Sequence, residues 1–402
     1  MKLAILSDFH LGNERFADDA FRQALKAMAL AVAESDAVLV PGDVFDSRVP
    51  RPEAIAQAIE IFRIPLERQW DAKIESFSAR DGRKNACRVP VIAIHGTHEV
   101  RPKLLVNPIQ LLEKGGFLVN AHAARVVIEC RNERVAVYGM GGVPEPQAQA
   151  ALAALDPAPT QGAFNVFTFH QSLRELLPVG EQYLSLEDLP AGFDAYVCGH
   201  MHRKLAERFG DKLLVIPGST VITQLKKEEE AKKGFFLLDT ASKQCAFREI
   251  SARPFFFREV KLDGAGLSEA EALVRKTIAE LAASADNPVI RVKVTGSLRG
   301  GVPTGAFACN RLAEEFSGRA FVSIEKDFGL TGIAEKVKRL RLAREEGASV
   351  RELGLALLRA KLAEKGFAGS DNAAHLFDML SSTRKDAAEK ALDEFLTASG
   401  AP

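Results

Sequence analysis

The sequence predicts an α/β domain, followed by a small α+β domain and a C-terminal helical module. Two observations support this fold class: short apolar strands alternate with helices over about the first 250 residues, and no strand pattern remains from Leu330 onward. The pattern of elements also changes around residues 251–254. A chain of 402 residues is too long for one typical core, and we place the domains at 1–252, 253–328 and 329–402.

In the first domain we expect short buried strands that end in polar loops bearing Gly or His. The expected ranges are 3–6, 37–40, 91–94, 166–169, 195–198 and 213–216. Apolar residues from Phe21 to Val32 recur at helical spacing after the first strand. Residues 66–88 are polar and of mixed charge, and we expect a solvated surface loop there rather than a phosphate-binding segment.

The second domain is expected to combine strands at 255–262, 289–295 and 321–325 with helices at 268–283 and 306–316. Beyond it, apolar residues gather on short helical faces, such as the face of Leu353, Leu357 and Leu358. The tail has little material for a core of its own, so we expect it to dock on another surface.

The composition is ordinary for a soluble globular protein, with 47% hydrophobic and 26% charged residues. No apolar run approaches the roughly 18 residues needed to span a bilayer, and the N-terminus turns polar too soon for a signal peptide. The five cysteines are widely spaced and form no CxxC pair. We therefore expect a cytoplasmic protein without membrane contact. A net charge of zero gives no argument for nucleic-acid binding by itself.

Five loops carry acidic and imidazole side chains in a fixed order along the chain. They read Asp8-Phe9-His10, Gly42-Asp43-Val44-Phe45-Asp46, Gly96-Thr97-His98-Glu99, Phe169-His170-Gln171 and Gly199-His200-Met201-His202. Mixed carboxylate and imidazole ligands suit Mn²⁺, Fe²⁺ or Zn²⁺ better than Ca²⁺. Each fragment alone is a weak signal, but five in this order indicate a metal site. His95, His122 and His375 fit none of the motifs, and we expect them to be structural.

These loops resemble the calcineurin-like metallophosphoesterase superfamily, whose motifs are D-x-H, G-D-x-x-D/H, G-N-H-D/E, H and G-H-x-H. The match covers about the first 220 residues. It implies a two-sheet sandwich flanked by helices for the first domain. It also implies two metal ions, for which Mn²⁺ is expected and Fe²⁺ or Zn²⁺ are possible. Their ligands would be Asp8, His10, Asp43, Thr97, His170, His200 and His202.

The resemblance also assigns roles to individual positions. Asp8, His10 and His202 would hold the first metal, and His170 and His200 the second.

Three further positions of the motifs complete this assignment. Asp43 would bridge the metals, and His98 would be the general acid that protonates the leaving oxygen after a metal-bound hydroxide attacks phosphorus. Asp46 varies in type within the family: it positions phosphate or orients a ligand, or it is simply a loop carboxylate bonded to the backbone.

One motif departs from the family pattern, because Thr97 stands where the family has Asn. A neutral hydroxyl is a shorter and weaker ligand than an amide carbonyl. Either Thr97 still ligates, directly or through water, or the second site binds its metal less tightly.

Further segments resemble the Mre11/SbcD nuclease branch of this superfamily. They are residues 215–220, residues 228–235 and the loop His170-Gln171-Ser172. The second domain is placed like the capping, DNA-binding domain of that branch, and the tail like its Rad50-binding helices. The resemblance implies a Mn²⁺-dependent 3′-to-5′ exonuclease and single-strand endonuclease in double-strand break repair. It also implies a Rad50/SbcC-type ABC ATPase as partner, a homodimer and association with the nucleoid.

Candidate contact residues follow from this resemblance. For DNA phosphates they are Arg101, Lys103, Arg253 and Arg258, each of which is otherwise a plain surface charge. For the ATPase they are Phe367, Leu376, Phe377, Leu380 and Phe395, which otherwise pack between the tail helices.

Two other functions compete with the nuclease. One is a small-molecule phosphodiesterase or phosphatase on the same catalytic domain, which leaves the remaining residues unexplained. The other is a scaffold that binds DNA or an ATPase and whose metal site Thr97 has weakened, against which stands the retention of all charged ligands.

Overall fold

The computed structural model describes residues 1–328, apart from 86, 103, 178–182 and 300–303, and beyond them only residues 352, 354, 355, 358, 359 and 377. The contacts that residues make with one another divide the chain into two compact units. The first comprises residues 1–258, 275–292 and 310–324, and the second comprises 259–274, 293–309 and 325–402. These units cut through several helices and strands, so they do not test the expected boundaries after residues 252 and 328, which stay a prediction.

The first sheet has six strands in the order β13-β12-β1-β2-β4-β5. They are β1 (Lys2–Ile5), β2 (Ala37–Val40), β4 (Val91–Ala93), β5 (Val119–Asn120), β12 (Gly234–Asp239) and β13 (Gln244–Glu249). Strands β1, β2, β4 and β5 pair in parallel, whereas β12 runs antiparallel to β1 and β13 antiparallel to β12. The parallel strands therefore end at one edge of the sheet.

The second sheet has seven strands in the order β10-β11-β9-β8-β7-β6-β3. They are β3 (Lys73–Ala79), β6 (Ala124–Cys130), β7 (Glu133–Met140), β8 (Phe164–Phe169), β9 (Ala195–Cys198), β10 (Leu205–Phe209) and β11 (Lys212–Ile216). Its central strands β7, β8, β9 and β11 are parallel. Both sheets thus have the parallel centres that place loops with chemistry at their carboxyl ends.

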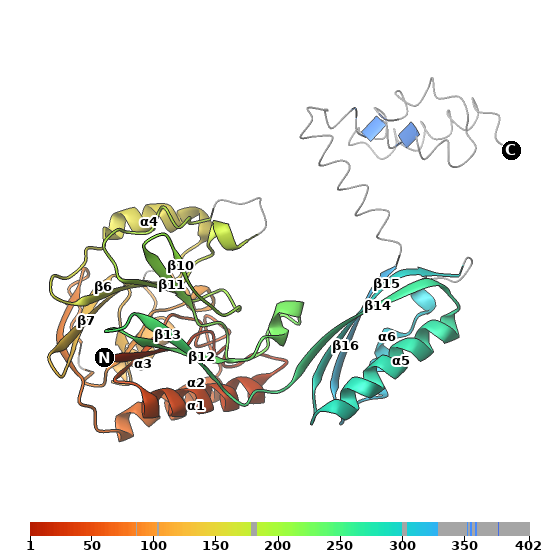
Figure 1. Cartoon of the computed structure of the whole chain (residues 1–402), viewed down its shortest axis with the longest axis horizontal. Coiled ribbons are helices and arrows are strands. Elements are labelled where there is room, and N and C mark those ends of the chain that lie inside the picture. Colours follow the sequence, from red (N-terminus) through yellow and green to blue (C-terminus); the bar gives the residue numbers. More distant parts are fainter. Residues whose placement is uncertain are drawn as a thin grey trace. The chain divides into compact units, whose positions relative to one another are not determined.

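Alternation of side chains explains how the sheets and helices are layered. In β1, Leu3 and Ile5 join a core shared with strands of the second sheet, while Ala4 packs in a core with α1 and α2. Figure 1 shows α1 and α2 on one side of the strands and α4 on the other. The helices of this part are α1 (Ala17–Glu34), α2 (Pro52–Arg63), α3 (Pro108–Lys114) and α4 (Ala148–Leu155). The expected α/β class is confirmed.

The remaining elements follow the expected order of strands and helices. They are β14 (Phe255–Ala265), α5 (Leu267–Ser284), β15 (Val289–Leu298), α6 (Cys309–Glu314) and β16 (Phe321–Phe328), and the strands form a sheet in the order β14-β15-β16. The expected helical module after residue 329 lies almost entirely outside the described residues. Within the part that the structure describes, no helix has both the length and the apolar character needed to cross a bilayer.

The expectation of a solvated loop at residues 66–88 is wrong in part. Residues 73–79 form β3, an edge strand paired with β6. Arg83 donates hydrogen bonds to the carbonyls of Asn120 and His122, so its guanidinium is held by the protein. A register shift between Ile74 and Ser76 breaks the alternation that would have revealed the strand.

Candidate metal centre

The five loops follow five parallel strands, β1, β2, β4, β8 and β9, and converge at their carboxyl ends. Four of the expected ligands adopt left-handed backbone conformations: φ is 54° at Asp8, 49° at His10, 48° at Asp43 and 73° at His200. Such conformations are costly for residues other than glycine, and they cluster at functional sites. The strained backbone therefore indicates a functional site at the carboxyl ends of these strands, independently of the motifs.

Glycines let the loops approach one another closely. A Cβ on Gly96 would lie 2.1 Å from Oδ1 of Asp43, and a Cβ on Gly199 would lie 2.2 Å from the carbonyl of Pro41. Gly42 has φ +105°, and its Cβ would lie 2.4 Å from Nδ1 of His170. The Gly that begins each of these motifs is therefore required by close packing around the acidic and imidazole groups.

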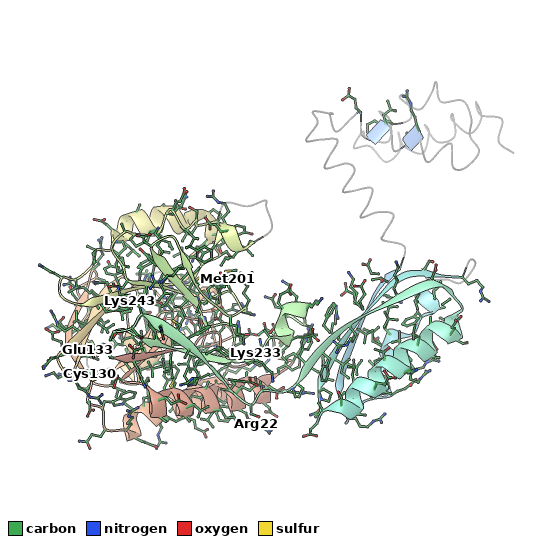
Figure 2. All side chains as sticks on the ribbon, viewed as in Figure 1. Arg22, Cys130, Glu133, Met201, Lys233 and Lys243 are labelled. Carbon is green, nitrogen blue, oxygen red and sulfur yellow. The ribbon has the colours of Figure 1, made fainter. Side chains whose placement is uncertain are left out.

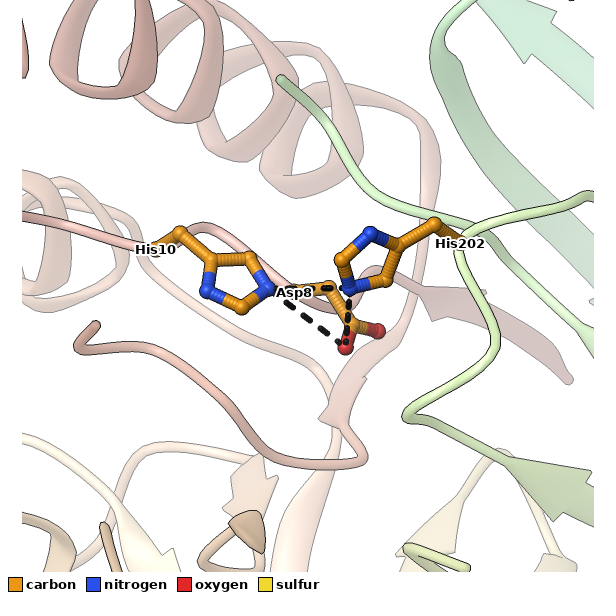
Figure 3. Close-up of side chains that lie close together, drawn as sticks. All are labelled: Asp8, His10 and His202. Atoms are coloured by element: carbon orange, nitrogen blue, oxygen red, sulfur yellow. Dashed lines mark hydrogen bonds and ion pairs between the residues drawn. The ribbon is translucent and has the colours of Figure 1, made fainter. Parts of the chain in front are cut away.

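The first cluster joins Asp8, His10 and His202, as expected. The Nε2 atoms of His10 and His202 lie 3.1 Å apart, and Oδ1 of Asp8 lies 4.0 Å and 3.8 Å from them (Figure 3). Oδ2 of Asp8 is buried and has no hydrogen-bond partner among the described residues. An unpartnered buried carboxylate oxygen is costly, and a cation would satisfy it.

The second cluster joins Asp43, His170 and His200, and in each of the two clusters the potential ligand atoms lie within 4.8 Å of one another. Nε2 of His170 lies 3.1 Å from Oδ2 of Asp43. Burial alone would lower the pKa of His170, but the Asp43 carboxylate raises it to about 9. Burial would raise the pKa of Asp43, but His170 outweighs it and holds that pKa well below its usual range. These donor sets fit two divalent cations.

Three of the four clustered imidazoles share one arrangement, in which Nδ1 contacts an outer oxygen and Nε2 faces the cluster. The contacts of Nδ1 are His10 to Asp46 Oδ1 at 2.8 Å, His170 to Pro41 O at 2.7 Å and His202 to Thr223 Oγ1 at 2.6 Å. A neutral imidazole has a single N–H, so donation from Nδ1 leaves the Nε2 lone pair available to a metal.

His200 is held differently from the other three. Its Nδ1 lies 3.3 Å from Oγ1 of Thr97, the position where the family has Asn, and its Nε2 lies 3.7 Å from Oε1 of Glu145. Oε2 of Glu145 is buried and lacks a hydrogen-bond partner among the described residues. Burial and the charge of His170 lower the pKa of His200 to about 4. The structure thus brings Thr97 next to the second cluster together with an acid that the motifs did not indicate.

His98 and Asp46 form the exposed rim of the site. The His98 side chain is 46% exposed, and its Nδ1 lies 3.2 Å from the carbonyl of Asp46 and 3.6 Å from its carboxylate. The same carboxylate is bonded to His10 and accepts from Nδ2 of Asn13 at 3.3 Å. Of the readings considered for Asp46, this geometry fits the one in which it orients a ligand.

Glu99 connects the loops beneath the site. Its carboxylate is fully buried and accepts hydrogen bonds from the backbone N–H groups of Phe45 and Gly96. Burial and the nearby charge of Asp43 raise its pKa to about 8. Because the side chain is enclosed, Glu99 stabilises the loops and does not face the substrate side.

Sequence analysis missed four residues around the clusters, Glu145, Thr223, Glu229 and Lys233. Glu229 and Lys233 form a buried ion pair next to Thr223. Burial would raise the pKa of Glu229, but His202 and Lys233 hold it well below its usual range. Both residues lie in the segment 228–235, which was noted for its resemblance to the Mre11/SbcD branch, but no role was assigned to either side chain.

The candidate DNA contacts are engaged within the protein. Arg253 pairs with Asp19 at 3.2 Å and donates to the carbonyl of Asn287 at 2.6 Å, and Arg258 pairs with Glu230 at 2.9 Å.

The other two candidate DNA contacts are Arg101 and Lys103. Nη1 of Arg101 donates to the carbonyl of Val106 at 3.2 Å, and Lys103 lies outside the described residues. The roles of the four basic residues in DNA binding stay predictions.

Of the candidate partner contacts, only Phe377 is among the described residues. It is half-buried, and a Cβ placed on Gly354 would lie 2.4 Å from two of its ring carbons. This contact fits packing within the tail, the alternative considered for that cluster. The other four, Phe367, Leu376, Leu380 and Phe395, lie outside the described residues.

The fold and the paired ligand clusters define a metallophosphoesterase. The chain belongs to the calcineurin-like phosphoesterase superfamily, because the sequence model of that domain matches residues 1–243, more than half of the chain. This confirms the resemblance drawn from the loop motifs.

The chain is also similar to proteins named Mre11, at low identity. It is 26% identical to "Double-strand break repair protein MRE11" of Encephalitozoon cuniculi, over 65% of this chain and 50% of that protein. It is 27% identical to "DNA double-strand break repair protein Mre11" of Methanopyrus kandleri, over 60% and 54% respectively. The protein of the same name from Sulfolobus acidocaldarius is 24% identical, over 74% and 76%. The matched part thus spans about half the length of the first two relatives.

Proposed function

We propose that this chain is a Mn²⁺-dependent DNA nuclease that degrades 3′ ends and cuts single strands during double-strand break repair. The observation that supports this most directly is the pair of carboxylate–imidazole clusters in a chain similar to Mre11 proteins. Imidazole and carboxylate donors together suit Mn²⁺, as well as Fe²⁺ and Zn²⁺.

The proposed chemistry is phosphodiester hydrolysis. Bound divalent metals would supply a hydroxide nucleophile and stabilise charge on the phosphoryl oxygens. His98 would donate a proton to the leaving sugar oxygen. The Asp46 carboxylate lies 3.6 Å from Nδ1 of His98, so it is placed to orient the imidazole ring.

The surroundings of the clusters support a large anionic substrate. A cleft of about 430 Å³ borders Asp43, His98 and both His200 and His202. Two exposed basic residues, Arg203 and Lys226, also line this cleft, as does the exposed Glu228. Positive side chains beside a metal site suit the phosphates that flank a scissile bond.

We propose a Rad50-type ATPase as partner through the tail, and a homodimer through the first domain. An exposed apolar segment supports the dimer: Leu104 is 96% exposed, Leu105 48%, Val106 44% and Leu111 44%. Exposed large apolar side chains that gather on a surface are typical of protein interfaces. Association with the nucleoid would follow from DNA binding.

One assay separates the three candidate functions. The purified protein is incubated with Mn²⁺ and 5′-labelled duplex DNA, circular single-stranded DNA or p-nitrophenyl phosphate esters, with Asp43→Asn as the inactive control. A ladder of shortened duplex strands and linearised circles support the nuclease. Ester hydrolysis alone supports a small-molecule enzyme, and DNA binding without cleavage supports a scaffold.

The partner is tested by co-purification. A chain truncated after Gly329 is expected to lose the ATPase while keeping metal-dependent hydrolysis. If the truncated chain still co-purifies with the ATPase, the tail is not the binding site.

A further inference from the structure

The two ring nitrogens of His202 lie in different surroundings. Nε2 faces the first cluster, 3.1 Å from Nε2 of His10 and 3.8 Å from Oδ1 of Asp8. Nδ1 points away from the cluster and lies 2.6 Å from Oγ1 of Thr223. Only Nε2 is therefore placed to bind a metal, and only if Nδ1 carries the ring proton.

The partner of the Thr223 hydroxyl decides which nitrogen carries that proton. Oγ1 of Thr223 lies 3.2 Å from Oε1 of Glu229, an oxygen that also accepts from the backbone N–H groups of Thr223 and Gln224, both at 3.1 Å. An ionised carboxylate can only accept hydrogen bonds, so the hydroxyl donates to Glu229. Its lone pair then accepts from Nδ1–H of His202, which leaves the Nε2 lone pair facing the cluster.

A buried lysine holds Glu229 in its ionised form. Lys233 lies directly before β12 and is 7% exposed (Figure 2). Its ammonium group pairs with Oε2 of Glu229 and donates to Oγ of Ser219 at 2.9 Å. A buried charge pair of this kind persists only when both partners are present and hydrogen-bonded. The carboxylate therefore has a fixed position and a fixed role as acceptor.

We infer that Thr223 is a positioning residue for His202, and that Glu229, fixed by Lys233, orients the Thr223 hydroxyl so that Nε2 of His202 is free to bind a metal ion. Metal-binding histidines commonly have their second nitrogen held by a carboxylate, directly or through an intermediate group, and loss of that partner lowers metal affinity or activity about 10–100-fold. The inference rests on the proposed metal site and not on DNA as the substrate.

The test compares matched threonine variants. Thr223→Val keeps the shape but removes the hydroxyl, whereas Thr223→Ser keeps the hydroxyl. Thr220→Val is the control, because Thr220 lies in the same loop, is fully buried and has a hydroxyl without a hydrogen-bond partner among the described residues. Mn²⁺ affinity is measured by calorimetric titration of the chelator-stripped full chain. The tautomer of His202 is read from ¹⁵N NMR spectra, with His202→Gln identifying its signals.

Thr223→Val is expected to weaken one of the two Mn²⁺ sites about 10–100-fold and to shift His202 away from the Nδ1–H tautomer. Thr223→Ser and Thr220→Val are expected to bind Mn²⁺ within about twofold of the natural protein and to keep that tautomer. If Thr223→Val does not fold, Thr223→Ala takes its place. Unchanged affinity in Thr223→Val, or equal loss in Thr220→Val, would overturn the inference.

The contribution of Glu229 needs a variant that leaves no isolated charge. Glu229→Gln combined with Lys233→Met removes both members of the pair, and it is expected to weaken the same Mn²⁺ site. Unchanged affinity and tautomer in this double variant would overturn the role of Glu229. A natural protein that binds two Mn²⁺ with this pattern but cuts no DNA would contradict the proposed function alone.

Discussion

Nε2 of His10 and Nε2 of His202 lie 3.1 Å apart, although 192 residues separate them in the chain. Among the described residues, neither nitrogen has another partner that would explain the approach, except the Asp8 carboxylate about 4 Å away. Two lone pairs facing each other are unfavourable unless a proton or a cation lies between them. The close approach of the two nitrogens therefore supports a cation site in the first cluster.

Replacing His98 by Ala should separate catalysis from metal binding. His98 lies at the exposed rim and groups with His10 and Asp46. It belongs to neither of the two clusters that the loop motifs indicate, so Mn²⁺ affinity should be unchanged. Loss of a general acid should lower kcat about 10²–10⁴-fold. Steady-state kinetics and Mn²⁺ titration check both statements, with Asp43→Asn as the variant expected to lose metal. Full activity of His98→Ala would exclude the acid role.

Replacing Asp46 by Ala should affect both properties at once. Its carboxylate holds Nδ1 of His10 at 2.8 Å and lies 3.6 Å from Nδ1 of His98. Without it, the His10 ring loses the partner that fixes its tautomer, and we expect Mn²⁺ affinity or activity to fall about 10–100-fold. Parallel measurements on His98→Ala provide the comparison. A variant with lower kcat and unchanged Mn²⁺ affinity would show that Asp46 acts on His98 alone.

Thr97→Asn should strengthen the second metal site. The Thr97 hydroxyl lies 3.3 Å from Nδ1 of His200. An Asn side chain at this position reaches further, and its amide carbonyl is a better metal ligand than a hydroxyl. We expect Thr97→Asn to decrease the Mn²⁺ dissociation constant of the weaker site, and Thr97→Val to increase it. Calorimetric titration of the two variants measures this directly. Identical binding by both would mean that residue 97 takes no part in the second site.

The buried His122 should make stability depend on pH. Its Nδ1 accepts a hydrogen bond from Gly141 at 2.9 Å, and burial, with the charge of Arg83, lowers its pKa from 6.5 to about 4. The unfolded chain therefore binds more protons between these values, so stability falls as the pH falls through this window. One such group contributes at most about 1.4 kcal/mol per pH unit.

Urea unfolding of the natural protein and of His122→Gln at pH 5, 6 and 7 measures this contribution. His95 is buried against His122, at 4.6 Å between ring centroids, and its pKa is also lowered, so only the difference between the two proteins isolates His122. If the free energy of unfolding changes with pH in the same way in both proteins, His122 does not contribute.

Gly96→Ala should destabilise the loops of the site. The added Cβ would lie 2.1 Å from Oδ1 of Asp43 and 2.4 Å from its backbone nitrogen, so the loops must separate. Overpacking of this kind typically costs about 1–3 kcal/mol. Gly305→Ala is the control, because an added Cβ there meets nothing within 4 Å. Thermal unfolding and Mn²⁺ titration should show a loss only in Gly96→Ala.

The sequence by itself determined the class of the first domain and the residues that meet at its strand ends. Apolar strands such as 37–40 and 195–198 are local patterns, and the polar loops that follow them must gather where parallel strands end. The prediction that Asp43 and His200 lie together came from the resemblance of the five loops to a known superfamily, and the structure places both in one cluster. Local spacing failed for β3, because a bulge places Ile74 and Phe77 out of alternation.

Only the tertiary structure decided which groups surround those ligands. Thr223 and Glu145 reach His202 and His200 from loops with no recognisable motif, and the pairing of Lys233 with Glu229 becomes buried only when these segments pack together. The physical reason is that a ligand's identity is set by its own side chain, whereas its tautomer and orientation are set by whichever oxygen the fold brings to its other nitrogen.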